Sequence, residues 1–441
     1  MKFYGRENEI DELRKIRQSS KTGSRMTVLT GRRRIGKTEL VDKALNDGKH
    51  PYLYLLITRR VEKELCGILQ EEVERGIGHP IAGHAARFAE LFEAVMIEAM
   101  THPLTLVIDE FQEFDRINAA VFGEIAGIWD RYHKKSRINL VISGSVNRLM
   151  NKIFFSDSKP LYGRNTGTMR LGHFPLSQLK RILTDHNPDW ANEDLLALWT
   201  LTGGVARYVE ILVDDHACTR KTMLKSVCSS TSLFFDEGRT VLADEFGKDY
   251  GTYFSILSAI ANGCTSFSDL NNAVGVEIGG HLTKMERDYG LIAKIRPAYE
   301  TSGNRNVSYR IDDCFFRFWF RFIYKYQYLI EQRQLKELLT LMNRDFDVFS
   351  GYALELYFRE KFIEEHAYTR VSGWWDRKGE NEIDLVCENE LTRRLDFYEV
   401  KTDPDRLRMG ALESKVESFL VKNPQFRDRK TACRGVSVRD M

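Results

Sequence analysis

The sequence predicts a multidomain α/β protein, and three features of the chain indicate this fold class. The first 172 residues alternate short apolar runs with helical patterns, which is typical of a parallel sheet covered on both faces. A glycine-rich loop joins one of these runs to a helix. The chain then becomes wholly helical and ends in a second group of strands. A length of 441 residues allows about three domains of roughly 150 residues each.

The pattern along the chain predicts five segments. The first four are a parallel-sheet core, a helical lid, a winged helix-turn-helix and a helical connector, and the fifth is an α/β tail that begins with a helix followed by three strands, a helix and a strand. The winged-helix segment is predicted from three short helices followed by a hairpin. The predicted segments are 1–175, 176–245, 246–312, 313–345 and 346–441.

Composition excludes several classes of protein. The apolar share is 43% and the net charge is +2, so the overall charge favours no particular partner. Seven scattered cysteines form no C-x-x-C pair, which is the profile of reduced intracellular thiols. The first residues are charged, and no stretch of about 20 residues is apolar enough to span a membrane. We therefore expect a cytoplasmic protein with no membrane partner.

A phosphate-binding loop, GRRRIGKT, follows the run MTVLT and precedes the helical segment ELVDKAL. Its two glycines let backbone N–H groups surround phosphates, while Lys37 reaches the β and γ phosphates and Thr38 ligates Mg²⁺. The sequence therefore predicts ATP and Mg²⁺ as cofactors. The predicted nucleotide-binding residues of this stretch are Gly31, Arg34, Ile35, Gly36, Lys37, Thr38 and Glu39.

The second half of the predicted ATP site is LTLVIDE, residues 104–110, an apolar run that ends in two acids. Asp109 is placed to hold Mg²⁺ through water, and Glu110 to polarise the attacking water. A solvated loop acid is the alternative for Glu110, and the phosphate loop upstream favours the catalytic interpretation.

These motifs resemble the archaeal-type ATPase family, within the AAA+/STAND region of P-loop proteins, in members with a C-terminal nuclease-like domain. The opening FYGRENEIDEL resembles the family motif whose Gly5 and Arg6 lie near the nucleotide base. VISGS resembles the strand that ends in a polar sensor, here Ser143 or Ser145. The resemblance implies an ATPase fold over nearly the whole chain.

Two further segments of the resemblance imply roles outside the phosphate loop. LYGRNTG resembles the segment that supplies an arginine finger to a neighbouring subunit, here Arg164, with an ordinary surface arginine as the alternative. TGGVARYVE resembles the lid motif, although the family has proline where this chain has Ala206. A homo-oligomer is left open as a partner.

The predicted winged helix and connector carry a modest excess of basic residues. The recognition helix is expected over 277–290, with the wing offering Arg305. In the connector, Arg317, Arg321 and Lys325 recur every four residues on a helix otherwise rich in aromatic residues. DNA contact and a packing role with a solvated cationic edge both fit this pattern, and DNA is the expected partner. The basic or polar positions expected on the recognition helix are His281, Lys284 and Arg287.

Two strands near the end of the chain, EIDLV and DFYEVK, place charges on one sheet face. Glu399 and Lys401 are two residues apart and point the same way, while Val400 points into the core. The tail resembles the PD-(D/E)xK nucleases, which implies Asp384 and Glu399 as metal ligands and Lys401 as the catalytic cation. Glu355, on the preceding helix, matches a further acid of that pattern. The alternative is a surface ion pair.

Two functions fit the whole sequence. The first is an ATPase that couples its nucleotide cycle to DNA binding and metal-dependent cleavage of nucleic acid. The second is a STAND-like switch, with the tail as a non-catalytic module that binds a partner.

Overall fold

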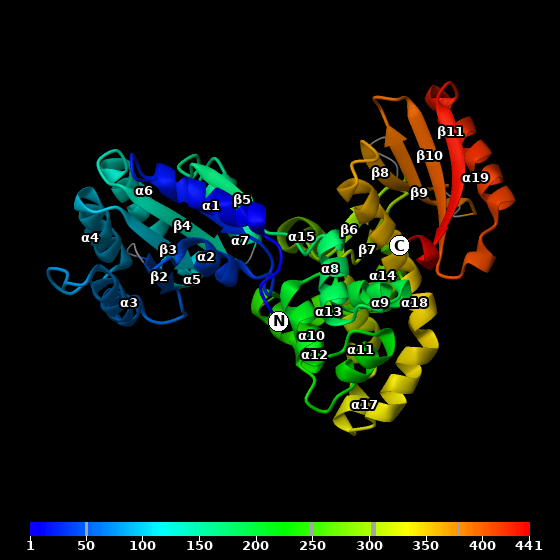
Figure 1. The fold of residues 1–441 in the computed structure, drawn as a ribbon, viewed down its shortest axis with the longest axis horizontal. Coiled ribbons are helices and arrows are strands. Elements are labelled where there is room, and N and C mark those ends of the chain that lie inside the picture. The colour runs from blue at the N-terminus through cyan, green and yellow to red at the C-terminus, as the bar shows by residue number, and fades with distance from the viewer. Residues whose placement is uncertain (49–51, 146, 247–249, 301–305, 377–379) are drawn as a thin grey trace. The chain divides into compact units, whose positions relative to one another are not determined.

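The structure, a computed structural model, describes residues 1–48, 52–145, 147–246, 250–300, 306–376 and 380–441. It divides into two compact units (Figure 1). The N-terminal unit is Gly5–Gly172, and the C-terminal unit combines Met1–Tyr4 with His173–Met441. The predicted boundary at residue 175 lies three residues from this division. None of the described helices is long and apolar enough to cross a membrane.

The N-terminal unit is built on a five-stranded parallel sheet in the order β2-β3-β4-β1-β5. Both central strands β3 and β4 are buried at every position, as continuous apolar runs predict for a sheet covered on both faces. The first four strands along the chain match the predicted runs to within a residue or two at each end. The five strands of the sheet are β1 (Arg25–Thr30), β2 (Tyr52–Leu56), β3 (Leu104–Asp109), β4 (Ile138–Gly144) and β5 (Gly167–Arg170).

The edge strand β5 was not predicted. It is four residues long and alternates half-buried and exposed positions, so its sequence, GTMR, carries no apolar run. Parallel pairing with β1, from Thr27 opposite Gly167 to Thr30 opposite Arg170, adds it to the sheet. The helices and the 3₁₀ turn of this unit are α1 (Glu7–Ser19), α2 (Lys37–Leu45), α3 (Glu62–Ile77), α4 (Phe88–Thr101), η1 (Phe111–Glu113), α5 (Phe114–Ile117), α6 (Val121–Tyr132) and α7 (Asn147–Phe155).

The C-terminal unit opens with five helices, where the sequence predicts a helical lid. Consecutive left-handed glycines, Gly203 (φ 57°) and Gly204 (φ 70°), separate the second from the third. The third helix begins at Ala206. These helices are α8 (Leu176–His186), α9 (Asn192–Thr202), α10 (Ala206–Asp214), α11 (Arg220–Val227) and α12 (Phe234–Phe246).

Three helices and a two-stranded antiparallel sheet follow, in the order expected of a winged helix-turn-helix. The third helix is shorter than predicted, because α15 ends at Lys284 and continues as a π-helical turn, η3 (Met285–Tyr289). Arg305 lies outside the described residues. The other elements of this segment are α13 (Tyr250–Ala261), α14 (Phe267–Val274), α15 (Gly279–Lys284), β6 (Ala293–Ile295) and β7 (Ser308–Arg310).

The connector leads into one long helix, α18 (Leu335–Glu364), of 30 residues. The predicted boundary between residues 345 and 346 therefore lies inside a continuous helix that belongs to both segments. Its buried side chains recur along its whole length, from Leu338 to Phe362, so no break in packing marks a domain edge. The preceding elements are α16 (Cys314–Phe318), the π-helical η4 (Trp319–Tyr324) and α17 (Gln327–Glu331).

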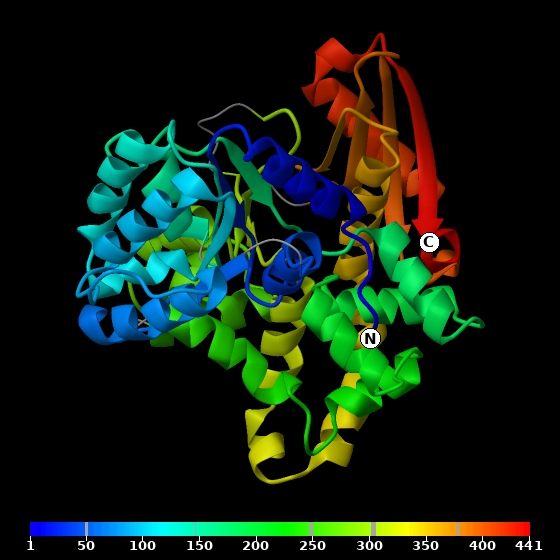
Figure 2. The same ribbon diagram turned by 60° about the vertical axis from the view of Figure 1, so that its left-hand side comes forward.

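The tail forms a four-stranded sheet in the order β11-β10-β9-β8, antiparallel except for the parallel pair β10 and β11. Its order of helix, three strands, helix and strand is the predicted one. Figures 1 and 2 show this sheet in orange and red, with α19 along one face and α18 contacting the other side. The elements are β8 (Arg370–Trp375), β9 (Glu382–Asn389), β10 (Arg394–Lys401), α19 (Met409–Lys422) and β11 (Lys430–Ser437), with short 3₁₀ turns η5 (Pro404–Arg406), η6 (Pro424–Phe426) and η7 (Val438–Asp440).

Candidate functional site

The loop between β1 and α2 has the backbone geometry that phosphate binding requires. Gly36 adopts φ 93°, and α2 begins at the next residue. A Cβ atom on Gly31 would lie 2.7 Å from the carbonyl oxygen of Leu171, so only glycine fits there. Arg34 is left-handed at φ 70°, an uncommon conformation for a residue with a side chain. The start of α2 therefore offers its free N–H groups as an anion-binding position.

Lys37 and Thr38 are the first two residues of α2 and lie beside the phosphate loop and Asp109. Lys37 is 7% exposed, and its Nζ donates to the carbonyl oxygens of Gly31 at 2.9 Å and Arg32 at 3.3 Å. Burial lowers the pKa of this lysine. The hydroxyl of Thr38 donates to Asp109 Oδ2 at 3.1 Å, so the two predicted Mg²⁺-side groups are in contact. Mg²⁺ prefers such oxygen ligands, and the pair fits it.

Glu110 is held at the end of β3 in a strained conformation. Its φ is 54°, in the left-handed region, where side chains are uncommon outside functional sites. Its Oε2 accepts a hydrogen bond from Ser145 Oγ at 2.8 Å and another from the amide of Gln112. Of the two predicted sensor residues, Ser145 therefore contacts the predicted catalytic acid. Ser143 is buried in β4, and its hydroxyl has no hydrogen-bond partner among the described residues.

The remaining residues predicted to bind nucleotide differ in how deeply they are buried. Gly5 (φ 63°) and Arg6 (φ 69°) form a left-handed turn before α1, and Arg6 donates to the carbonyl oxygen of Gly172. Burial lowers the pKa of Arg6. Ile35 is 2% exposed and supports the loop from inside, whereas Arg34 and Glu39 are exposed.

Tyr54 is a site residue that the sequence analysis missed. Its hydroxyl, on β2, donates to Asp109 Oδ2, the same oxygen that Thr38 contacts. Burial, followed by this hydrogen bond, raises the pKa of Tyr54. In the register of β2 with β3, Tyr54 lies opposite Val107, two residues before Asp109, and the sequence carries no signal of this pairing.

The predicted tail site brings three residues together. Lys401 Nζ lies 3.2 Å from Asp384 Oδ2 and 3.4 Å from Glu399 Oε1, so the lysine occupies the position between the two acids. Asp384 Oδ2 also accepts the backbone N–H of Val400 at 2.7 Å. Burial lowers the pKa of Lys401, but the two carboxylates outweigh it and raise the pKa above its ordinary value. Glu399 is 6% exposed, and its Oε2 has no hydrogen-bond partner in the described part of the chain.

Glu355 lies at the edge of this group on α18. Burial, followed by repulsion from Asp384, raises the pKa of Glu355 to about 8. Arg310, at the end of β7, lies 3.9 Å from Glu355 Oε2 and 3.2 Å from Glu382 Oε1. Sequence reasoning missed Arg310, because it lies 45 positions before Glu355 and in another predicted segment.

The described residues contain no group of three or more His, Cys, Asp or Glu side chains placed to hold a metal ion. Asp384 and Glu399 are two carboxylates, and in the predicted pattern a backbone carbonyl completes the ligand set. The orphaned Glu399 oxygen, buried beside Asp384 and Lys401, fits a cation that would take the place of the ammonium group.

Comparison with known proteins matches two segments of the chain to known families. Residues 3–212 match the family described as "ATPase domain predominantly from Archaea". Residues 3–212 are therefore similar to an archaeal-type ATPase domain. Residues 319–409 match a second family, described as "Archaea bacterial proteins of unknown function", which covers η4, α18 and β8 to β10.

Two similar proteins extend the comparison along the chain. An uncharacterized protein of Methanocaldococcus jannaschii is 27% identical over 408 residues, which are 90% of this chain and 87% of that protein. A Walker-type ATPase of Pyrococcus abyssi has a similar fold, with a TM-score of 0.53 at 18% identity, covering 72% of this chain and 96% of that one. This similarity supports the predicted fold of the chain.

Arg164, the predicted finger of the ATPase domain, is engaged within its own unit. Its Nε and Nη2 lie 3.0 Å and 2.6 Å from the two carboxylate oxygens of Asp130 on α6. The Arg164 guanidinium lowers the pKa of Asp130. A finger role would require this exposed pair to open.

The sequence predicts that the three cations of the connector lie on one face of a helix, and this prediction is wrong. Arg317 and Arg321 line one cavity, but Lys325 does not, and its ammonium group lies 5.6 Å from the ring centre of Tyr326. The π-helical turn η4 contains Arg321 and lies between Arg317 and Lys325. Because a π-helical turn holds more residues than an α-helical turn, a spacing of four no longer keeps the three side chains in line.

Proposed function

We propose that this chain hydrolyses ATP with Mg²⁺ in its N-terminal unit and uses the nucleotide cycle to govern a C-terminal unit that binds and cuts nucleic acid. The contact of Thr38 with Asp109 beside the buried Lys37 carries the first part of this proposal. Bound Mg²⁺ would neutralise charge on the phosphates. Lys37 would hold the β and γ phosphates, and Glu110, oriented by Ser145, would position the attacking water.

The nucleic-acid part rests on the described surface of the C-terminal unit. Lys284 and Arg287 are exposed on α15 and the turn that follows it, while His281 is half-buried and lies 5.1 Å from the ring of Tyr253. Exposed cations on a helix of this module are suited to backbone phosphates. In the tail, Asp384 and Glu399 would hold a divalent cation against a phosphate, with Lys401 steadying the attacking water.

A second function, an ATP-dependent switch with a non-catalytic tail, is favoured by a specific observation. Lys401 already pairs with both predicted ligands, and Arg310 already lies beside Glu355 and Glu382. A tail neutralised by its own side chains could serve as a binding module for a partner protein.

The two functions differ in turnover. For the first, single- or double-stranded DNA should raise the ATPase rate, and Mg²⁺ or Mn²⁺ should permit nicking that Lys401→Ala abolishes. For the switch, hydrolysis should be slow, should not respond to DNA, and should leave nucleotide bound through purification. Measuring the ATPase rate and DNA cleavage in one preparation separates them. A rate unaffected by DNA, together with no cleavage, contradicts the first function.

The Arg164 finger and a homo-oligomer form a separate part of the proposal. If Arg164 acts on a neighbour's nucleotide, mixing Arg164→Ala with Lys37→Ala chains should partly restore ATPase activity, since Lys37→Ala keeps its own Arg164. Asp130→Asn, which removes the negative charge paired with this arginine, should not lower activity. A chain that stays monomeric with ATP and DNA at high concentration contradicts the finger role.

A further inference from the structure

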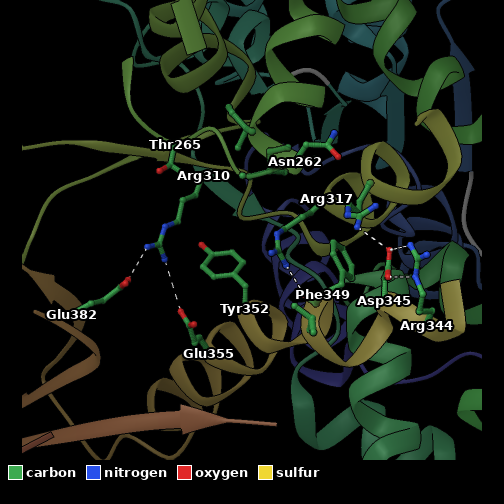
Figure 3. Close-up of a pocket in the computed structure, with 16 residues that line it drawn as sticks. Asn262, Thr265, Arg310, Arg317, Arg344, Asp345, Phe349, Tyr352, Glu355 and Glu382 are labelled. Atoms are coloured by element: carbon green, nitrogen blue, oxygen red, sulfur yellow. Dashed lines mark hydrogen bonds and ion pairs between the residues drawn. The ribbon is translucent and has the colours of Figure 1, made fainter. Parts of the chain in front are cut away.

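A cavity of about 480 Å³ in the C-terminal unit has no role in the functions considered so far (Figure 3). It lies between the end of α13, the end of β7, the connector and α18, and β9 contributes Glu382. Four guanidinium groups line it, against three carboxylates. The charged lining residues are Arg310, Arg317, Arg321, Arg344, Asp345, Glu355 and Glu382.

Each of the three acids lies within ion-pair distance of at least one of three arginines. Arg310 lies near both Glu355 and Glu382, at 3.9 Å and 3.2 Å. Asp345 receives Arg321 at 3.0 Å and Arg344 at 2.7 Å. Because Arg321 and Arg344 share one carboxylate and the fourth arginine has none within ion-pair distance among the described residues, the cavity keeps an excess of positive charge.

Arg317 is that fourth arginine, and no carboxylate of the described residues lies within ion-pair distance of it. It donates to the carbonyl oxygen of Phe349 at 3.0 Å, and its guanidinium lies 4.6 Å from the ring centres of Phe349 and Tyr352. Figure 3 shows the Tyr352 ring between Arg317 and Arg310. Burial lowers the pKa of Arg317, which indicates the cost of a desolvated cation without a counter-ion.

Arg321 supplies a second unsatisfied group in the same cavity. Its Nη1 is buried and has no hydrogen-bond partner within the described ranges, although its Nη2 reaches Asp345. It belongs to the π-helical turn η4, a local geometry frequent at functional sites. An anion that accepts from Arg317 and Arg321 would satisfy both, and the guanidinium fork matches the oxygens of phosphate.

The cavity continues toward the predicted tail site. Val348, Tyr352 and Glu355 also line a second cavity, of about 700 Å³, whose wall includes Lys401. A free nucleotide would occupy only one of these cavities, whereas a nucleic-acid strand would place successive phosphates in both. Cations along the backbone with aromatic rings between them are the arrangement by which proteins hold single strands.

We propose that the cavity around Arg317 and Arg321 binds the backbone phosphate of a single-stranded nucleic acid and leads that strand to the tail site. This inference rests on the proposed nucleic-acid function and names the form of its substrate. Each guanidinium donates to a phosphate oxygen, and the Tyr352 ring offers a face to the neighbouring base.

The test is equilibrium binding of a fluorescently labelled oligo(dT) strand to the full chain in EDTA, in the Lys37→Ala background so that the ATP site does not bind phosphate. Arg317→Gln and Arg321→Gln should each weaken strand binding about tenfold or more, as expected for loss of a charged hydrogen bond. Each should also reduce the slope of log affinity against log salt by about 0.7. Arg317→Lys should fall between wild type and Arg317→Gln.

Two further variants keep the test decisive. Arg344→Gln changes a largely exposed cation at the rim, which avoids folding defects, and should weaken binding in the same direction. Arg393→Gln is the matched control: it removes an equally exposed arginine, paired with Asp428, that lines neither cavity, and should leave binding unchanged.

Three results would overturn the proposal. In the first, the three cavity variants bind the strand like their parent. In the second, inorganic phosphate or AMP binds the parent and loses affinity in Arg317→Gln while strand binding is unchanged, so the cavity is a small-anion site. In the third, Arg393→Gln weakens binding as much as the cavity variants. Because EDTA removes the metal, failure of the tail as a nuclease would leave these results unaffected and would appear only in the cleavage assay.

Discussion

The ATP site and the tail site hold their charged groups in opposite ways. In the N-terminal unit, Lys37 contacts main-chain carbonyls, and Asp109 and Glu110 are held by hydroxyl, amide and backbone N–H donors. Among the described residues, none of these three forms an ion pair. In the tail, Lys401 lies between Asp384 and Glu399.

The two arrangements place different requirements on the binding of a charged ligand. The ATP site holds its charges in place with neutral groups, so it can meet phosphate and Mg²⁺ without first breaking a salt bridge. The tail neutralises itself, so a metal ion must displace an ammonium group before it can bind two carboxylates. We therefore expect the tail to bind metal more weakly than the ATP site binds nucleotide. We also expect metal binding by the tail to depend more strongly on pH.

The largest effect is expected at Glu110. Glu110→Gln should keep ATP binding and slow hydrolysis about 10²–10⁴-fold, because it removes a positioned general base. Single-turnover hydrolysis beside ATP binding measures both. Glu71→Gln, an exposed acid on α3, is the control and should hydrolyse normally. Hydrolysis by Glu110→Gln at the wild-type rate would remove Glu110 from the mechanism.

Lys37→Ala should abolish tight ATP binding while the fold is retained. Its ammonium group contacts the β and γ phosphates in the proposed complex, and charged hydrogen bonds of this kind contribute about 1.5–3 kcal/mol each, or roughly 10–150-fold in affinity. Calorimetric titration with ATP, together with circular dichroism, measures both properties. Unchanged affinity in the folded variant contradicts the role of this loop.

Metal should stabilise the C-terminal unit without ATP. Saturation to 100 times the dissociation constant adds about 2.7 kcal/mol, so Mn²⁺ should raise the melting temperature of the nucleotide-free chain. Asp384→Ala and Glu399→Ala should lose this response. Lys401→Ala should keep it, since lysine is not a ligand, and should lose cleavage. Equal metal responses from wild type and Asp384→Ala would mean that the tail has no metal site.

Glu355 should make the stability of the C-terminal unit pH-dependent. Its pKa of about 8 in the folded chain exceeds the ordinary value of 4.5, so the folded state keeps a proton that the unfolded state releases. Stability therefore falls as the pH rises from 4.5 to 8. Melting curves should show a smaller fall for Glu355→Gln, and an unchanged one for the exposed control Glu365→Gln. Identical pH profiles for wild type and Glu355→Gln would rule out this titration.

The smallest effect is expected in the predicted lid. Ala206 is the first residue of α10, where proline is favoured, and the preceding Val205 is extended at φ −72° and ψ 122°, as a residue before proline must be. Ala206→Pro should therefore stabilise the chain by about 0.4–1 kcal/mol, by restricting the unfolded state. Chemical denaturation measures this. Destabilisation would show that the lid turn here differs from the family pattern.

Much of the ATP site could be predicted from the sequence, because the phosphate loop is contiguous and its function depends on backbone shape. Gly31, Gly36, Lys37 and Thr38 lie within eight positions, and the acid pair ends one apolar strand. Tyr54 could not be predicted, because it meets Asp109 only through the pairing of β2 with β3. The choice of Ser145 over Ser143 likewise required the hydrogen bond to Glu110.

The order of elements was also readable from the sequence, since hydrophobic periodicity reports which faces are buried. Four parallel strands and the order of the tail were predicted, whereas β5 was not, because an edge strand of four residues buries too little to leave a pattern. The continuity of α18 across residue 345 was also missed: its buried face continues through both segments, while the predicted boundary followed a change in composition.

Local spacing along the chain was enough to predict the parallel-sheet fold of the N-terminal unit and the nucleotide loop. The tertiary structure alone decided that Arg310 meets Glu355, that Lys401 sits between two acids, and that Arg317 is left without a carboxylate partner among the described residues. The physical reason is that these charges come from elements far apart in the chain. Their pairing depends on how helices and strands pack, which no spacing along one segment records.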